Sequence, residues 1–294
     1  MTRVRAGLGK VVGRFREQPG TPAPRLSAPV KPRDDAAVRE PPIFIIGCQR
    51  SGTSLLRRIV DSHSRIACPP ESKFVRSVAG LLRDEPSLKG LESMGFDRRE
   101  IVRATAEFIA SFFDEYAAAQ GKPRWADKTP NYVDCLDELW EMFGPSARFL
   151  LVVRDGMDVA YSLSKRPYPA IEEFLQPASG DRAVAAGLFW ANQNRKIRSF
   201  SADHLDACHE VRYEDLTTDP APTLREVFAF LGEQWEPSVL DYSRHPHHRG
   251  IEDPDVRRLR RIVSNSGSHR TWPKATREAV REACQPVLSE LGYG

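Results

Sequence analysis

Residues 42–54 read PIFIIGCQRSGTS, and this stretch decides the fold. The apolar run at residues 43–46 is typical of a strand that is buried on both faces of a parallel sheet. Gly47 and Gly52 allow the chain to turn tightly, and apolar residues at helical spacing begin at Leu55. A strand, a glycine-containing loop and a helix in this order predict an anion cradle at the start of the helix.

The loop lacks the lysine of a triphosphate-binding loop. It keeps the spacing of the pattern G-x-x-x-x-G-K-[ST], but Thr53 takes the lysine position. Arg50 supplies a cation instead, and its planar guanidinium can hold two oxygens of a phosphate or sulfate. A second apolar strand at residues 149–153 is followed by Arg154, with Asp155 only after it, so magnesium binding is poorly supported. A glycine turn without a ligand is the alternative.

Strand and helix patterns alternate along the rest of the chain. Asp97 with Glu100 forms a predicted capping box for a helix that carries Phe108 and Phe112, and Asp181 is a second predicted cap. A short strand is expected at residues 210–212. This order predicts one α/β domain over residues 41–294, with a mainly parallel central sheet flanked by helices in a three-layer, P-loop-like arrangement.

Composition and charge exclude several classes of protein. The chain has 294 residues, 40% of them hydrophobic, and a net charge of +3, which is too small to indicate nucleic-acid binding. No segment approaches the roughly 18 apolar residues of a membrane span. The five cysteines are scattered without a C-x-x-C pair. A secretory signal is lacking, so we expect a cytoplasmic location.

Residues 1–40 are expected to be a disordered, basic and proline-rich tail. Apolar residues such as Leu8 and Phe15 fall on one helical face within it, with arginine and lysine around them. Weak contact with a membrane surface or a partner is therefore an alternative to a solvated tail.

The chain resembles 3′-phosphoadenosine 5′-phosphosulfate (PAPS)-dependent sulfotransferases, in the branch that contains protein-tyrosine sulfotransferases and related bacterial enzymes. Residues 42–54 resemble the 5′-phosphosulfate loop of that family, and residues 148–164 (RFLLVVRDGMDVAYSLS) resemble its 3′-phosphate motif. Residues 126–130 (ADKTP) and 211–216 (VRYEDL) add to the likeness, which extends over roughly residues 42–242.

The resemblance implies a set of donor-binding residues. The 5′-phosphosulfate would be held by Arg50 and the loop backbone, and the 3′-phosphate by Arg154 and Ser162, while Tyr213 would lie near the nucleotide. Within the loop the residues concerned are Ser51, Gly52, Thr53 and Ser54. For Arg154, a structural salt bridge is the alternative. Further contacts are expected from residues 264–274, where no clear match exists.

Two residues are candidates for catalysis. By the same resemblance Glu71 would be the base that takes the acceptor's proton, and Lys128 would stabilise charge in the transferring group. Ordinary surface roles are the alternatives for both. His63 is a rival base, because other branches of the family use histidine, but a structural role at a helix end is favoured.

The sequence therefore predicts a sulfotransferase that moves a sulfuryl group from PAPS to a hydroxyl, by in-line displacement and without metal, and that releases 3′,5′-adenosine bisphosphate (PAP). A P-loop kinase or NTPase and an inactive adenylate-binding protein are the alternatives. The acceptor would be a sugar, a phenol, a small metabolite or a peptide. No oligomeric state is predicted. His245, His247 and His248 are interpreted as a solvated loop rather than a metal site.

Overall fold

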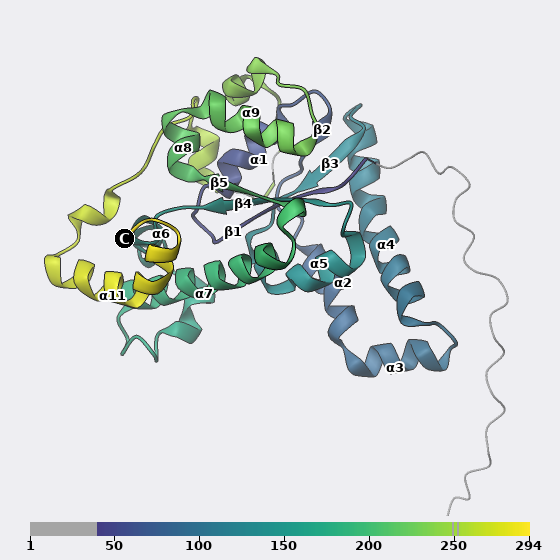
Figure 1. Cartoon of the computed structure of the whole chain (residues 1–294), viewed down its shortest axis with the longest axis horizontal. Coiled ribbons are helices and arrows are strands. Elements are labelled where there is room, and N and C mark those ends of the chain that lie inside the picture. Colours follow the sequence, from purple (N-terminus) through teal and green to yellow (C-terminus); the bar gives the residue numbers. More distant parts are fainter. Residues whose placement is uncertain (1–39, 249, 252) are drawn as a thin grey trace, which may run out of the picture.

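The computed structural model of the chain describes residues 40–248, 250–251 and 253–294. Its centre is a sheet of five parallel strands in the spatial order β2-β3-β1-β4-β5 (Figure 1). The strands are β1 (Ile43–Gly47), β2 (Ile66–Ala67), β3 (Arg124–Asp127), β4 (Arg148–Val153) and β5 (Cys208–Arg212). β1 pairs with β3 on one side and with β4 on the other. The strand that leads into the anion loop therefore lies in the middle of the sheet.

Helices cover both faces of this sheet (Figure 1). The helices of the described residues are α1 (Thr53–Asp61), α2 (Phe74–Ala79), α3 (Glu85–Ser93), α4 (Arg98–Ala119), α5 (Leu136–Phe143), α6 (Gly156–Ser164), α7 (Arg182–Asp203), α8 (Tyr213–Thr218), α9 (Pro220–Leu231), α10 (Pro254–Arg258) and α11 (Lys274–Glu290). Short 3-10 segments link them: η1 (Gly80–Arg83), η2 (Pro130–Cys135), η3 (Pro169–Phe174), η4 (Leu205–Ala207), η5 (Pro237–Arg244) and η6 (Ser268–Thr271). The predicted three-layer α/β fold is confirmed.

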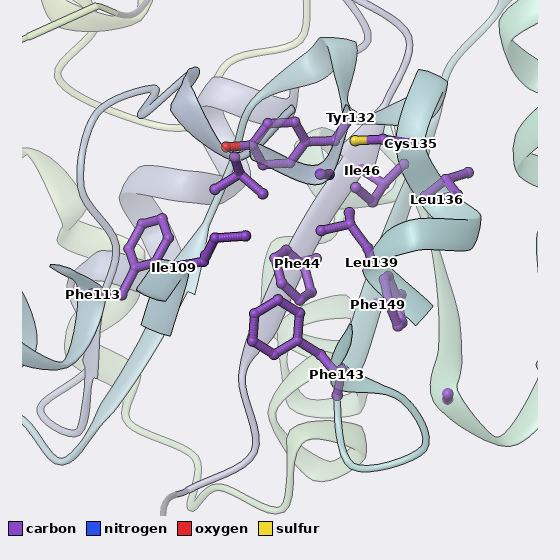
Figure 2. Close-up of a cluster of buried hydrophobic side chains, with 14 of the residues drawn as sticks. Phe44, Ile46, Ile109, Phe113, Tyr132, Cys135, Leu136, Leu139, Phe143 and Phe149 are labelled. Atoms are coloured by element: carbon purple, nitrogen blue, oxygen red, sulfur yellow. The ribbon is translucent and has the colours of Figure 1, made fainter. Parts of the chain in front are cut away.

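The core explains why the strands are apolar on both faces. On one face, Phe44 packs against Phe143 and Phe149 with ring centroids 5.5 and 5.4 Å apart, and Ile109 of α4 and Leu139 of α5 lie beside them (Figure 2). On the other face, α1, α8 and α9 bury a second cluster against the sheet. Each buried side chain of this size contributes about 1.5–3 kcal/mol, so the strands are fixed firmly.

Local signals in the sequence set the helix boundaries. The capping box at α4 is present, because Asp97 Oδ1 accepts from Glu100 N and Glu100 Oε2 accepts from Asp97 N, each at 2.9 Å. Asp181 caps α7 through Ala183 N at 2.8 Å. Both predicted helix starts are confirmed.

Apart from Glu40, the predicted tail lies outside the described residues, and its disorder and surface contact stay predictions. The cytoplasmic location also stays a prediction. In the part of the chain that the structure describes, none of the helices combines the length and apolar character that crossing a membrane requires.

The parallel sheet brings several loops to one edge. The loops that leave β1, β3 and β4 lie side by side at the carboxyl ends of the strands, because these strands are neighbours and run in one direction. From β1 the chain runs to β2 and β3 on one side of the sheet, and from β3 it crosses to β4 on the other side of β1. Ligands of open α/β sheets bind at such a switch point.

Candidate functional site

The loop between β1 and α1 has a conformation that requires its glycines. Arg50 and Gly52 have φ values of 71° and 99°. A Cβ atom on Gly52 would lie 2.4 Å from Cδ2 of Tyr213, so the ring of Tyr213 closes directly on the loop. The left-handed backbone at Arg50 is unusual for a residue with a side chain, and such strain clusters at ligand sites. The loop and the start of α1 form the predicted cradle.

Arg50 uses all of its guanidinium nitrogens. Its Nε donates to Ser162 Oγ at 2.9 Å, which joins the β1 loop to α6. Its Nη1 lies 2.5 Å from Asp253 Oδ2, and its Nη2 lies 3.3 Å from Asp255 Oδ2. The cation of the cradle is therefore already paired with two carboxylates from the C-terminal part of the chain.

Arg154 follows β4 and lies behind the same loop. Its guanidinium stacks on the ring of Tyr213 at 4.1 Å, and its Nη1 donates to the carbonyl oxygen of Arg50 at 3.0 Å. Its Nη2 donates to the carbonyl oxygen of Asn265, and the N–H of Asn265 donates to the hydroxyl of Tyr213 at 3.2 Å. Arg154 thus links the loop after β1, the start of α8 and the C-terminal segment.

Glu71 and Lys128 form an ion pair on the other side of the loop. Lys128 Nζ lies 2.6 Å from Glu71 Oε1 and donates to Ser54 Oγ at 3.1 Å. The Lys128 side chain is fully buried, while that of Glu71 is 15% exposed. Burial lowers the pKa of the Lys128 ammonium, and the Glu71 carboxylate counteracts part of this effect. The other carboxylate oxygen, Oε2, lies 3.8 Å from Lys73 Nζ.

The loop that carries Glu71 is held by hydrogen bonds at Glu71 and at Ser72. The N–H of Glu71 donates to the carbonyl oxygen of Ile251 at 2.9 Å. Ser72 Oγ donates to Asp127 Oδ2 at 2.8 Å and lies 2.6 Å from the hydroxyl of Tyr132. Burial raises the pKa of Asp127 to about 6. These contacts place Glu71 relative to the end of β3.

A cavity of about 300 Å³ lies where these groups meet. Its lining includes Gln49, Arg50, Gly52, Thr53, Ser54, Glu71, Arg154, Tyr168, Tyr213, Asp253, Asp255 and Asn265. Three buried polar atoms around it, Gln49 Oε1, Ser51 Oγ and Arg154 Nε, have no hydrogen-bond partner among the described residues. Unsatisfied buried donors are costly in a protein without a ligand. Ser51 Oγ and Arg154 Nε suit the phosphate oxygens of a nucleotide donor.

All of the residues predicted from the sequence lie in or beside this one site. Lys128 and Ser162 contact it from behind, through Glu71 and Arg50. Their roles stay predictions, because position alone does not test them. Asp253, Asp255 and Asn265 were missed, since no motif marks their segment.

The histidines lie elsewhere. His63 stacks on Phe228 at 4.8 Å, and its Nε2 lies 2.9 Å from the carbonyl oxygen of Gln234, in agreement with a structural role. The interpretation of His247 as solvated is wrong, because its side chain is only 4% exposed. Its Nδ1 lies 2.6 Å from Asp61 Oδ2, so the pair packs inside the protein.

One group of potential metal ligands occurs among the described residues. Atoms of Asp155, Asp158 and His269 lie within 4.8 Å of one another. The two oxygens of Asp158 accept from the backbone N–H groups of Gly267 at 2.7 Å and His269 at 3.3 Å, and Asp155 accepts from Met157 N. These carboxylates hold backbone, so the group is explained as an anchor for the segment around residue 267.

Comparisons with known proteins identify the family of the chain. Residues 41–237 match the model of a family described as "Sulfotransferase family". The protein-tyrosine sulfotransferase of Drosophila melanogaster is 28% identical over 274 residues, which cover 86% of this chain and 52% of that protein. Nodulation protein NoeE of Sinorhizobium fredii is 27% identical over 282 residues, which cover 85% of this chain and 65% of NoeE. The chain thus spans about half to two thirds of the length of these two relatives.

Structural comparison supports the same assignment at the level of the fold. The sulfotransferase domain from the curacin biosynthetic pathway superimposes with a TM-score of 0.59 at 20% identity, covering 87% of this chain and 99% of that domain. The predicted resemblance is confirmed, since the matched region contains both phosphate motifs and the Glu71 and Lys128 loops. This chain belongs to the sulfotransferase family.

Proposed function

We propose that this protein transfers a sulfuryl group from PAPS to the hydroxyl of an acceptor, without the help of a metal ion. The observation that carries the proposal is the convergence of Arg50, Arg154 and the Glu71–Lys128 pair on one cavity at the carboxyl edge of the sheet. Anion-binding groups and a candidate base thus adjoin the same space, which sulfuryl transfer to an alcohol requires.

The donor is proposed to bind across the two phosphate motifs. Arg50 and the N–H groups at the start of α1 would hold the 5′-phosphosulfate, since these N–H groups have no partners within the helix. Arg154 and Ser162 would hold the 3′-phosphate, and the ring of Tyr213 would support the nucleotide. The unpartnered Ser51 Oγ and Arg154 Nε provide donors for the added oxygens.

Transfer is proposed to follow in-line displacement. Glu71 accepts the proton of the acceptor hydroxyl as that oxygen forms its bond to sulfur. The bond between sulfur and the bridging phosphate oxygen breaks, its electrons stay with that oxygen, and PAP is the leaving group. Lys128 holds Glu71 in place, and its ammonium can stabilise charge on the transferring group.

The acceptor is proposed as a class of hydroxyl compounds. The Drosophila relative is named for tyrosine, a phenol within a polypeptide. For this chain a phenol, sugar, small metabolite or peptide hydroxyl is proposed, with Tyr168 and Arg166 in the lining of the cavity.

Calorimetry separates this function from its rivals. PAP should bind to the full chain in a buffer that contains EDTA to remove divalent metal ions. A kinase or NTPase would instead prefer ATP with magnesium. Sulfation with radiolabelled PAPS across acceptor classes then separates an enzyme from an inactive binder. Preference for ATP with magnesium, or no binding of PAP, would refute the proposal.

A further inference from the structure

The cation of the anion cradle is occupied by two carboxylates of the chain itself. We propose that Asp253 and Asp255 act as an internal anion that holds Arg50 in the free protein and that the 5′-phosphosulfate must displace. They would thereby set the affinity for the donor and assist release of the product. This inference rests on the proposed function, because it concerns the ligand of the same site.

Each nitrogen of the Arg50 guanidinium already has a partner within the protein. Nη1 and Nη2 face Asp253 at 2.5 Å and Asp255 at 3.3 Å, and Nε donates to Ser162. These are the charge-assisted bonds that a phosphate or sulfate would make with the same guanidinium. A ligand anion that binds Arg50 through the same N–H groups therefore replaces these carboxylates.

Electrostatics makes the exchange necessary. The donor brings negative charge to a cavity that already contains the carboxylates of Asp253, Asp255 and Glu71. Like charges at contact distance repel each other, most strongly where water is partly excluded. The donor and the two aspartates therefore compete for one cation.

The aspartates are placed so that they can leave Arg50. Their side chains are 18% and 45% exposed, in contrast with the fully buried strands behind the loop. Asp255 Oδ2 also lies 3.1 Å from the guanidinium of Arg166, which gives it a second partner when Arg50 turns to a ligand. Asp253 uses its other oxygen to cap the five-residue helix α10 through Asp255 N at 3.1 Å.

The test replaces both carboxylates by amides in the full chain, as Asp253→Asn with Asp255→Asn. Asparagine keeps an oxygen that caps α10, so the charge is removed while the local fold is preserved. PAP and 5′-AMP should each bind about five- to tenfold more tightly to the variant, because the internal competitor is gone. The inhibition constant of PAP as a product should fall by the same factor.

Two controls sharpen the result. 3′-AMP lacks the 5′-phosphate and should gain no affinity. Asp241→Asn removes an exposed carboxylate that pairs with Arg244, and it should leave PAP binding unchanged. If the double variant does not fold, Asp255→Asn alone should still give part of the gain.

The outcomes also separate this inference from the proposed function. Unchanged or weaker binding of PAP to the folded variant would overturn the inference, since a supporting contact rather than a competitor would then be lost. Failure of the unaltered protein to bind PAP would instead refute the proposed function.

Discussion

The loops at the ends of the strands and the segment that covers them are built in different ways. The strand-end part consists of the loops after β1, β2, β3 and β4, which leave strands that are almost entirely buried. The covering segment, defined here as residues 253–271, is attached through separate contacts to Arg50, Arg154 and Asp158. The proposed chemistry therefore lies next to buried strands, while the covering segment is held by a few separate hydrogen bonds and ion pairs.

The largest effect should come from the strand-end part, at Glu71. Glu71→Gln keeps an oxygen for Lys128 but removes the base, so kcat should fall at least about a hundredfold. Calorimetry should show nearly unchanged affinity for PAP, since Glu71 is proposed to act on the acceptor and not on the nucleotide. Glu92→Gln, at an exposed glutamate of α3, is the matched control. A variant that kept normal turnover would remove Glu71 from the mechanism.

Arg154→Ala should weaken PAP binding by about 10- to 100-fold, because charge-assisted hydrogen bonds to the nucleotide are lost. Arg154 is 6% exposed, joins both parts of the site and has one unpartnered nitrogen among the described residues. Arg260→Ala replaces an exposed arginine of the covering segment and should change the affinity little. Equal losses of PAP affinity in both variants would mean that the overall positive charge of the region, and not specific contacts of Arg154, binds the nucleotide.

The same division explains what the sequence could predict. The loop at residues 47–54 and Arg154 are marked by glycine spacing and by their place after apolar strands, which are local signals. The parallel sheet then brings them together with Glu71 and Lys128, although 57 positions separate those two residues. Neighbouring strands place their following loops at one edge, so a fold prediction is enough to predict this part of the site.

Contacts of the covering segment could not be predicted in this way. Asp253 contacts Arg50, which lies 203 positions earlier in the chain, and the short helix that follows Asp253 has no sequence pattern that indicates a partner. Helix α4 shows a similar limit. Phe108 and Phe112 mark it in the sequence but are about half exposed, while Ile109 and Phe113 are buried. When both faces of a helix contain aromatic residues, tertiary packing decides which face is buried.

A smaller effect concerns the stability of the strand-end part and not the binding of a ligand. Asp127 is fully buried, and its pKa of about 6 exceeds the ordinary 3.8. The folded protein thus retains a proton that the unfolded chain releases, so this group makes stability fall as the pH rises from about 4 to about 6. Above that window Asp127→Asn should raise the free energy of unfolding by about 1–2 kcal/mol.

Urea unfolding at pH 7.5 and below pH 4 checks this dependence. The gain should be present at pH 7.5 and absent at about pH 3, where the Asp127 carboxyl is largely protonated in both the folded and the unfolded chain. Asp203→Asn, at the exposed end of α7, should show no such difference. A variant less stable than the unaltered protein at pH 7.5 would show that the ionised carboxylate supports the fold.

The smallest effect is expected in the covering segment, at His269. Its Nδ1 lies 2.9 Å from Asp158 Oδ1, but the backbone N–H groups of Gly267 and His269 also donate to Asp158. His269→Ala removes only the side-chain contact, so PAP affinity should fall about threefold or less. Asp158→Ala removes all three contacts and should cost more. Hydrogen exchange at residues 264–271 should rise in the same order, because the segment opens more often when fewer contacts hold it. A loss at His269→Ala as large as that at Arg154→Ala would contradict the division, since a segment held by exchangeable contacts should tolerate the removal of one.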